Sequence, residues 1–317
     1  MKLFHETKIK FYSKISQPRI CVLSDIHFSD QVKNKRLDAI MNKMREKKPD
    51  YIFIPGDLID SNDMISDSKE EERLLNWLKG LGEIATVIIS VGNHDVCKKP
   101  NVKNRLKGDW EVYENHKFLE KVNALENVFY LNDEKYEDSK IYVLGFTLSP
   151  NYYNFLGQRA SVLHPVHEKL DEILSELDNI DQKLITNLPK NKLKFLLIHS
   201  PVFLTDHRVK AELAEFDYFV SGHMHNGIVP PVIDELWRSS TGFVSPTHNM
   251  LPRNIRTTKK TVADKMIIAG AVTTWHECSG PLHNLNAFYP TYFMTLEFTK
   301  NHQYDRKPEI TKKYLNF

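Results

Sequence analysis

Short apolar runs that end in Asp, Asn or His recur along the chain. They occupy residues 19–30, 51–60, 85–95, 193–201 and 216–225. Continuous apolar runs of this length are typical of strands that are buried on both faces of a sheet. Between them, residues 34–48 and 71–84 have the periodicity of amphipathic helices. The alternation predicts an α/β fold with polar side chains at the carboxyl ends of its strands.

Three further segments carry less regular patterns. Residues 1–23 have polar side chains every few positions and predict a strand or a hairpin. Residues 127–148 predict two more strands, joined as a hairpin by a polar turn. The apolar spacing within 166–188 suits an amphipathic helix, which belongs either to the body of the fold or to a cap over a site.

No internal repeat and no low-complexity linker divides the chain. We therefore expect one domain over residues 1–317 with a decorated rim. A small cap or insertion would lie within about 149–190, and a C-terminal rim would cover about 226–317.

Composition narrows the class of protein. The 317 residues are 41% hydrophobic and 26% charged, as in ordinary soluble domains, and the net charge of +2 is too small to imply a polyanionic partner. Cys21, Cys97 and Cys278 form no CxxC pair, which favours a reducing compartment over a disulfide scaffold or a thiolate zinc site. No segment reaches the roughly 20 apolar residues of a membrane span, and the N-terminus has no signal-peptide pattern. We expect a cytoplasmic protein without a transmembrane segment.

The polar residues at the predicted strand ends are of types that bind metals. They are Asp25 and His27 in SDIH, Asp57 and Asp60 in GDLID, Asn93, His94 and Asp95 in GNHD, His199 in IHSP, and His223 and His225 in GHMH. In an extended backbone, residues two apart point to the same side, so His223 and His225 form either a metal grip or part of a His-rich loop. Each fragment alone has a purely structural explanation, but together they predict a metal site.

The order Asp-x-His, Gly-Asp-x-x-Asp, Gly-Asn-His-Asp, His, Gly-His-x-His resembles the calcineurin-like metallophosphoesterase family, and every element is present without substitution. The resemblance implies a four-layer α-β-β-α sandwich, with a two-metal site at one edge of its paired sheets. The segment after GHMHNG also resembles bacterial members of unassigned substrate. The motifs are specific for the family and do not define the substrate.

The resemblance further implies a set of metal ligands. Asp25, His27 and His225 would bind one ion, Asn93, His199 and His223 would bind the second, and Asp57 would bridge the two. A bridging carboxylate can hold two cations at the roughly 3.5–4 Å separation that two-metal hydrolysis uses. Imidazole and carboxylate ligands suit manganese, iron or zinc and disfavour calcium. Two divalent metal ions held by only two carboxylates leave the site positive, which attracts a phosphate.

The reaction implied is hydrolysis of a phosphate ester by a hydroxide that bridges the metals. His94, next to Asn93, is expected to protonate the leaving group or to stabilise the transition state. Asp95 or Asp60 would hold the ring of His94 or orient a ligand histidine.

Residues outside the motifs bear on the substrate. Arg253 and Arg256 lie on a Pro-rich, basic stretch that could hold a second phosphate, with a solvated loop as the alternative. A small-molecule or lipid-linked phosphate is expected, either as a monoester or as a diester or pyrophosphate linked to a nucleotide or lipid. A nuclease would need a broad basic groove with stacking aromatics, of which the net charge gives little sign. A non-catalytic scaffold would have lost a ligand or the catalytic histidine, and none is lost. The sequence therefore predicts a metal-dependent phosphoesterase.

Overall fold

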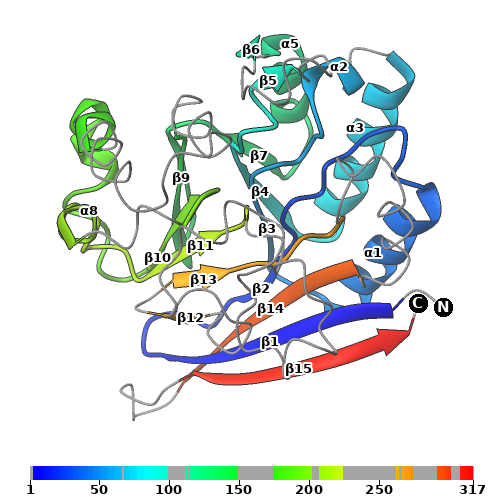
Figure 1. Cartoon of the computed structure of the whole chain (residues 1–317). Coiled ribbons are helices and arrows are strands. Elements are labelled where there is room, and N and C mark those ends of the chain that lie inside the picture. Colours follow the sequence, from blue (N-terminus) through cyan, green and yellow to red (C-terminus); the bar gives the residue numbers. More distant parts are fainter. Residues whose placement is uncertain are drawn as a thin grey trace, which may run out of the picture.

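Two β-sheets pack face to face in this protein, between two layers of helices (Figure 1). A computed structural model describes residues 3–65, 68–98, 111–112, 115–148, 174–201, 207–223, 262–263, 266–273, 291–300 and 308–316. The seven-stranded first sheet has the order β15 (Glu309–Asn316), β1 (Leu3–Ser13), β14 (Thr291–Lys300), β2 (Arg19–Val22), β3 (Tyr51–Pro55), β4 (Thr86–Ser90) and β7 (Val128–Leu131). The six-stranded second sheet has the order β12 (Val262–Ala263), β13 (Met266–Ile268), β11 (Tyr218–Ser221), β10 (Leu193–Ile198), β9 (Ile141–Phe146) and β8 (Glu134–Glu137). A separate two-stranded ribbon pairs β5 (Cys97–Lys98) with β6 (Glu111–Val112).

Strands β3 and β9 have no charged position, because both of their faces are buried. In β3, Tyr51 and Phe53 point into the core between the sheets, whereas Ile52 and Ile54 point into the core under the helices. This alternation is the two-residue period of an extended chain. Across the middle core, the rings of Phe53 and Phe195 meet edge to face with centroids 5.3 Å apart.

Helices cover the outer face of each sheet (Figure 1). The first sheet is covered by α1 (Asn34–Lys47), α2 (Asn62–Ile65), α3 (Ser68–Gly82) and α5 (His116–Asn123). The second sheet is covered by α8 (His207–Glu212), a helical turn at 174–179 and the 3-10 turn η2 (Gln182–Leu184). The four layers confirm the predicted α-β-β-α sandwich, and α1 and α3 confirm the two helices predicted at 34–48 and 71–84.

The N-terminal segment forms strands and no hairpin. Strand β1 pairs with β14 in parallel and with β15 in antiparallel register, so the two ends of the chain lie side by side (Figure 1). Because β14 lies between β1 and β2, the hairpin alternative for residues 1–23 is wrong.

The segment 127–148 contains three strands where the sequence predicts two. Strand β7 belongs to the first sheet, and β8 pairs with β9 as a hairpin in the second. The hairpin turn is fixed by Asp138, whose Oδ1 accepts hydrogen bonds from the N–H groups of Lys140 and Ile141 at 2.7 and 2.9 Å. The polar residues after β7 instead lead the chain from one sheet to the other.

The described part of the predicted cap region packs on the fold itself. Leu177 and Ile180 are buried against the outer face of the second sheet. Residues 149–173 lie outside the described residues, so a cap there stays a prediction. No helix in the described part of the chain is long and apolar enough to span a bilayer.

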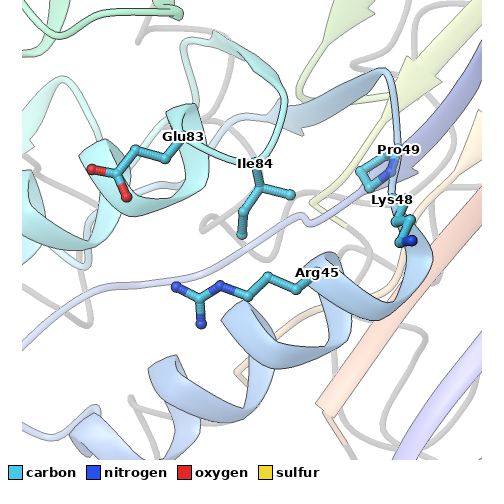
Figure 2. A pocket seen from close by; sticks show the side chains of 5 residues that line it. All are labelled: Arg45, Lys48, Pro49, Glu83 and Ile84. Carbon is cyan, nitrogen blue, oxygen red and sulfur yellow. The ribbon is translucent and has the colours of Figure 1, made fainter.

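A pocket of about 380 Å³ lies beyond the carboxyl ends of α1 and α3 (Figure 2). Its lining consists of Arg45, Lys48, Pro49, Glu83 and Ile84. Lys48 and Pro49 precede strand β3, so the pocket lies at the opposite end of that strand from Asp57. It is therefore separate from the candidate site.

Candidate metal centre

The candidate ligands follow the carboxyl ends of strands in both sheets. Asp25 and His27 follow β2, Asp57 follows β3, Asn93 follows β4, His199 follows β10, and His223 follows β11. Strands β2, β3 and β4 are parallel neighbours, as are β10 and β11. The carboxyl ends of parallel neighbours meet at one edge, where open α/β sheets usually bind ligands.

Asp57 lies at the middle of the cluster. Its Oδ2 is 2.9 Å from His199 Nε2 and 3.6 Å from His27 Nε2. Its Oδ1 accepts a hydrogen bond from the backbone N–H of His94 at 2.9 Å. The potential ligand atoms form two groups, and the atoms of each group all lie within 4.8 Å of one another. The groups are His27–Asp57–His94 and Asp57–His199–His223. Asp57 is common to both groups, which is the position that a bridging carboxylate requires.

Asp25 connects the ligand loops of the two sheets. Its carboxylate accepts hydrogen bonds from Ser24 Oγ at 2.5 Å and from the backbone N–H of His223 at 3.0 and 3.1 Å. Its Oδ1 also lies 3.9 Å from His199 Nε2. The sequence reasoning missed Ser24, although its place directly before the Asp-x-His pair was a signal for such a role.

Four of the candidate ligands have a left-handed backbone. The φ angles of Asp25, His27, Asp57 and His223 are 51°, 44°, 52° and 66°. Residues other than glycine seldom adopt this region, and such conformations gather at functional sites where the surroundings hold them. The turns that carry these side chains are therefore maintained by their contacts and not by local preference.

Two motif glycines let the ligand loops approach one another. A Cβ atom on Gly92 would lie 2.2 Å from the backbone nitrogen of Asp57 and 2.3 Å from its Oδ1. A Cβ atom on Gly222 would lie 1.9 Å from Ser24 Oγ and 2.7 Å from Asp25 Oδ2. Any side chain at either position would displace a candidate ligand.

Asp60 and Asp95, both expected near His94, have different contacts. The backbone oxygen of Asp60 accepts a hydrogen bond from His94 Nδ1 at 2.6 Å, and its Oδ1 lies 3.8 Å from His27 Nδ1. The Asp95 carboxylate instead accepts hydrogen bonds from the N–H groups of Ile59 and Gly92 at 3.1 and 2.8 Å. Asp60 thus lies beside the rings, while Asp95 ties the GNHD turn to the GDLID loop.

Burial and the close approach of acidic and imidazole groups shift the pKa values of several site residues. Burial acts to lower the pKa of His199, but the charge of Asp57 and its hydrogen bond raise that pKa to about 9. Burial acts to raise the pKa of Asp57, but His199, His94 and His27 hold it well below its usual range. Burial and the charge of Asp57 raise the pKa of Asp95 to about 7. Asp57 is therefore an ionised carboxylate, as a metal bridge requires.

The residues fit divalent metal ions. His199 Nδ1 donates to the backbone oxygen of Pro55 at 2.8 Å, which leaves Nε2 facing Asp57, and metal-binding histidines usually have such a partner. Asn93 Oδ1 is buried without a hydrogen-bond donor among the described residues, as expected of an oxygen reserved for a cation. His225, Arg253 and Arg256 lie outside the described residues, so their roles stay predictions.

The family follows from comparison with known proteins. The profile of the calcineurin-like phosphoesterase family matches residues 18–227. This chain belongs to the calcineurin-like phosphoesterase family. The match confirms the resemblance seen in the motifs, and with it a metal-dependent phosphoesterase domain of the hydrolase class. Metal-dependent phosphoester hydrolysis is accordingly the chemistry of this domain, and divalent metal ions are its implied cofactors.

Individual relatives of this calcineurin-like phosphoesterase are distant. An uncharacterized metallophosphoesterase of Campylobacter jejuni is 24% identical over 237 residues, which cover 73% of this chain and 50% of that protein. The chain thus spans half the length of this curated relative. A dimetal phosphatase from Danio rerio shares 10% identity over 67% of this chain and 83% of its own, with a TM-score of 0.37. The GAP50 anchor of the inner membrane complex of Plasmodium shares 16% identity over 67% of each chain, with a TM-score of 0.31.

Proposed function

We propose that this protein hydrolyses a small-molecule or lipid-linked phosphate at a centre of two divalent metal ions. The proposed ligands are Asp25, His27, Asp57, Asn93, His199, His223 and His225. The observation that carries the proposal is that Asp57 belongs to both groups of potential ligand atoms. When bound, divalent ions supply a water of lowered pKa and positive charge for the phosphoryl oxygens.

The charge of the ligand residues favours an anionic substrate. Asp25 and Asp57 are the only acidic residues in the proposed set, and Asn93 offers a neutral amide oxygen. Two dications would therefore leave the centre positive, and a phosphate group would be attracted and oriented there. The mixture of imidazole and carboxylate favours manganese, iron or zinc over calcium.

His94 is the proposed proton donor to the leaving group. Its Nδ1 is 2.6 Å from the backbone oxygen of Asp60, and a carbonyl oxygen only accepts, so Nδ1 carries a hydrogen. Nε2 is then the ring nitrogen that can exchange a proton with substrate. The ring is fixed further by His27, which it meets edge to face at 4.5 Å between centroids. Asp60 acts through these two rings as a positioning residue.

We expect the purified protein with added Mn²⁺ to hydrolyse an activated aryl phosphate. The same preparation should be screened against phosphomonoesters, phosphodiesters and pyrophosphates, since the ligand set suits all three. Exhaustive chelation should abolish turnover, and readdition of Mn²⁺ should restore it. Turnover that persists once elemental analysis finds almost no metal would overturn the two-metal proposal.

Arg253 and Arg256 are proposed to bind a remote phosphate or acidic group of the natural substrate. The double change Arg253→Ala with Arg256→Ala should then reduce kcat/KM for the substrate found in the screen. An aryl phosphate too small to reach these residues should be hydrolysed almost as before.

The matched control is Arg45→Ala with Lys48→Ala, which removes the same charge at the pocket on the other end of β3 (Figure 2). This control should leave kcat/KM unchanged for both substrates. If the Arg253 and Arg256 variant behaves like the control, the two arginines belong to a solvated loop. Equal losses on both substrates would instead indicate damage to the metal centre.

A further inference from the structure

The Ala269–Thr273 segment connects the two sheets at the edge where the candidate ligands lie. The segment follows β13, and the N–H of its first residue, Ala269, donates a hydrogen bond to the backbone oxygen of Ser221 at 2.8 Å. Ser221 is two residues before His223, so this contact fixes the ligand loop of the second sheet. The segment lies beyond the part of the chain that the family profile matches.

The other end of the segment reaches the Asp-x-His turn of the first sheet. Ala271 forms a parallel bridge with Ser24, and the N–H of Val272 donates to the backbone oxygen of Ser24 at 2.8 Å. The N–H of Thr273 donates to the backbone oxygen of Asp25 at 3.2 Å. One short segment is thus hydrogen-bonded to the backbones of both ligand loops.

The Thr273 side chain completes these contacts at the turn itself. Its Oγ1 donates to the backbone oxygen of Ile26 at 2.7 Å and lies 3.4 Å from that of Asp25. Thr273 is fully buried, so water does not replace the hydroxyl if it is lost. Ile26 lies between Asp25 and His27, which both have a left-handed backbone. Such a turn persists only where the surrounding groups hold it.

We propose that Thr273 is a positioning residue of the metal centre. Its hydroxyl and N–H hold the carbonyl groups of Asp25 and Ile26, and thereby set the directions in which the side chains of Asp25 and His27 leave the turn. The proposal rests on the proposed function, since it presumes that these two side chains bind metal. It adds a residue that is 248 positions from Asp25 in the chain and whose hydroxyl bonds to backbone oxygens of the turn.

Thr273→Val tests this role because valine keeps the branched shape and loses the hydroxyl. We expect Mn²⁺ binding, followed by the electron paramagnetic resonance of free Mn²⁺ or by calorimetry, to weaken by about 10- to 100-fold, as is common when an outer-shell partner is removed. Thr273→Ser keeps the hydroxyl and should bind Mn²⁺ about as tightly as the wild type. The serine variant thus separates the hydrogen bond from the packing of the side chain.

The matched control is Thr295→Val, which removes another buried threonine hydroxyl, this one in β14 of the first sheet. Thr295 Oγ1 donates to Glu6 Oε1 at 2.8 Å, and its strand partner is Cys21. Both threonine changes should lower Tm, because each removes a buried hydrogen bond, but Thr295→Val should leave Mn²⁺ binding unchanged. A loss of affinity confined to the Thr273 variant therefore reports on the site and not on general stability.

Wild-type Mn²⁺ affinity in Thr273→Val would overturn the positioning role while leaving the proposed function intact. A wild-type protein that binds no Mn²⁺, Fe²⁺ or Zn²⁺ would instead overturn the proposed function itself. If Thr273→Val does not fold, the pair Thr273→Ala and Thr273→Ser gives the same comparison. Equal Mn²⁺ affinity in that pair would also contradict the role of the hydroxyl.

Discussion

Asp57→Asn is expected to release most of the bound metal from both positions and to reduce turnover below detection. The carboxylate lies within ligand distance of His27 on one side and of His199 and His223 on the other. An asparagine side chain can still accept the hydrogen bond that Asp57 receives from His94 N–H at 2.9 Å. The fold should therefore survive, while the bridging negative charge is lost from two cations at once. Elemental analysis after gel filtration measures the loss.

The control for this change is Asp138→Asn. Asp138 is also a carboxylate that accepts several hydrogen bonds, from Tyr51, Lys140 and Ile141, but it lies in the β8–β9 turn. Its replacement should cost some stability and should retain the metal content of the wild type. If Asp57→Asn also retains both ions, Asp57 is no bridge and the ligand assignment has to be rebuilt around the remaining residues.

The strand ends could be predicted because the strands are buried on both faces. In β3 the residues from Tyr51 to Pro55 are all buried, so the run has no polar position until Asp57 follows it. The same reasoning applies to β10, where His199 follows the buried apolar run 195–198, and the polar Lys194 lies at the start of the strand. Parallel order then brings these polar ends to one edge. The gathering of candidate ligands at the edge of each sheet thus follows from hydrophobicity and strand direction.

The partners of the terminal strands could not be predicted in this way. Strand β1 lies between β14 and β15, which come from the other end of the chain. Nothing in residues 1–23 indicates which distant strand will supply their hydrogen bonds. The prediction of two strands in 127–148 was wrong for a related reason. A polar turn gives the same sequence pattern whether the next strand returns to the same sheet or joins the opposite one. Local pattern defines a strand and leaves its sheet undefined.

The contacts that hold the site were equally beyond reach of the sequence. Thr273 donates hydrogen bonds to the carbonyl oxygens of Asp25 and Ile26 in the Asp-x-His turn, and a threonine far from any motif carries no local signal. The sequence also could not tell which of Asp60 and Asp95 lies beside the histidine rings, because each is two or three residues from a predicted ligand. Only the folded backbone separates the carboxylate beside the rings from the one that binds N–H groups.

His94→Ala is expected to lower kcat for an alkyl phosphate by about 10²- to 10⁴-fold, which is the usual effect of losing a general acid. Metal content should stay close to that of the wild type, because His94 is not among the proposed ligands. The geometry makes this a sharp test, since His94 lies in the same group of potential ligand atoms as His27 and Asp57. A metal loss as large as that of Asp57→Asn would make His94 a ligand.

Two substrates separate proton donation from other roles of His94. An aryl phosphate with an acidic leaving group needs little protonation, whereas an alkyl phosphate leaves as a strongly basic alkoxide. If His94 donates the proton, His94→Ala should slow the alkyl ester far more than the aryl ester. His116→Ala, an exposed histidine at the start of α5, should slow neither. Equal losses on both esters would show that His94 stabilises the phosphoryl group in the transition state, because that group is common to the two substrates while the leaving group is not.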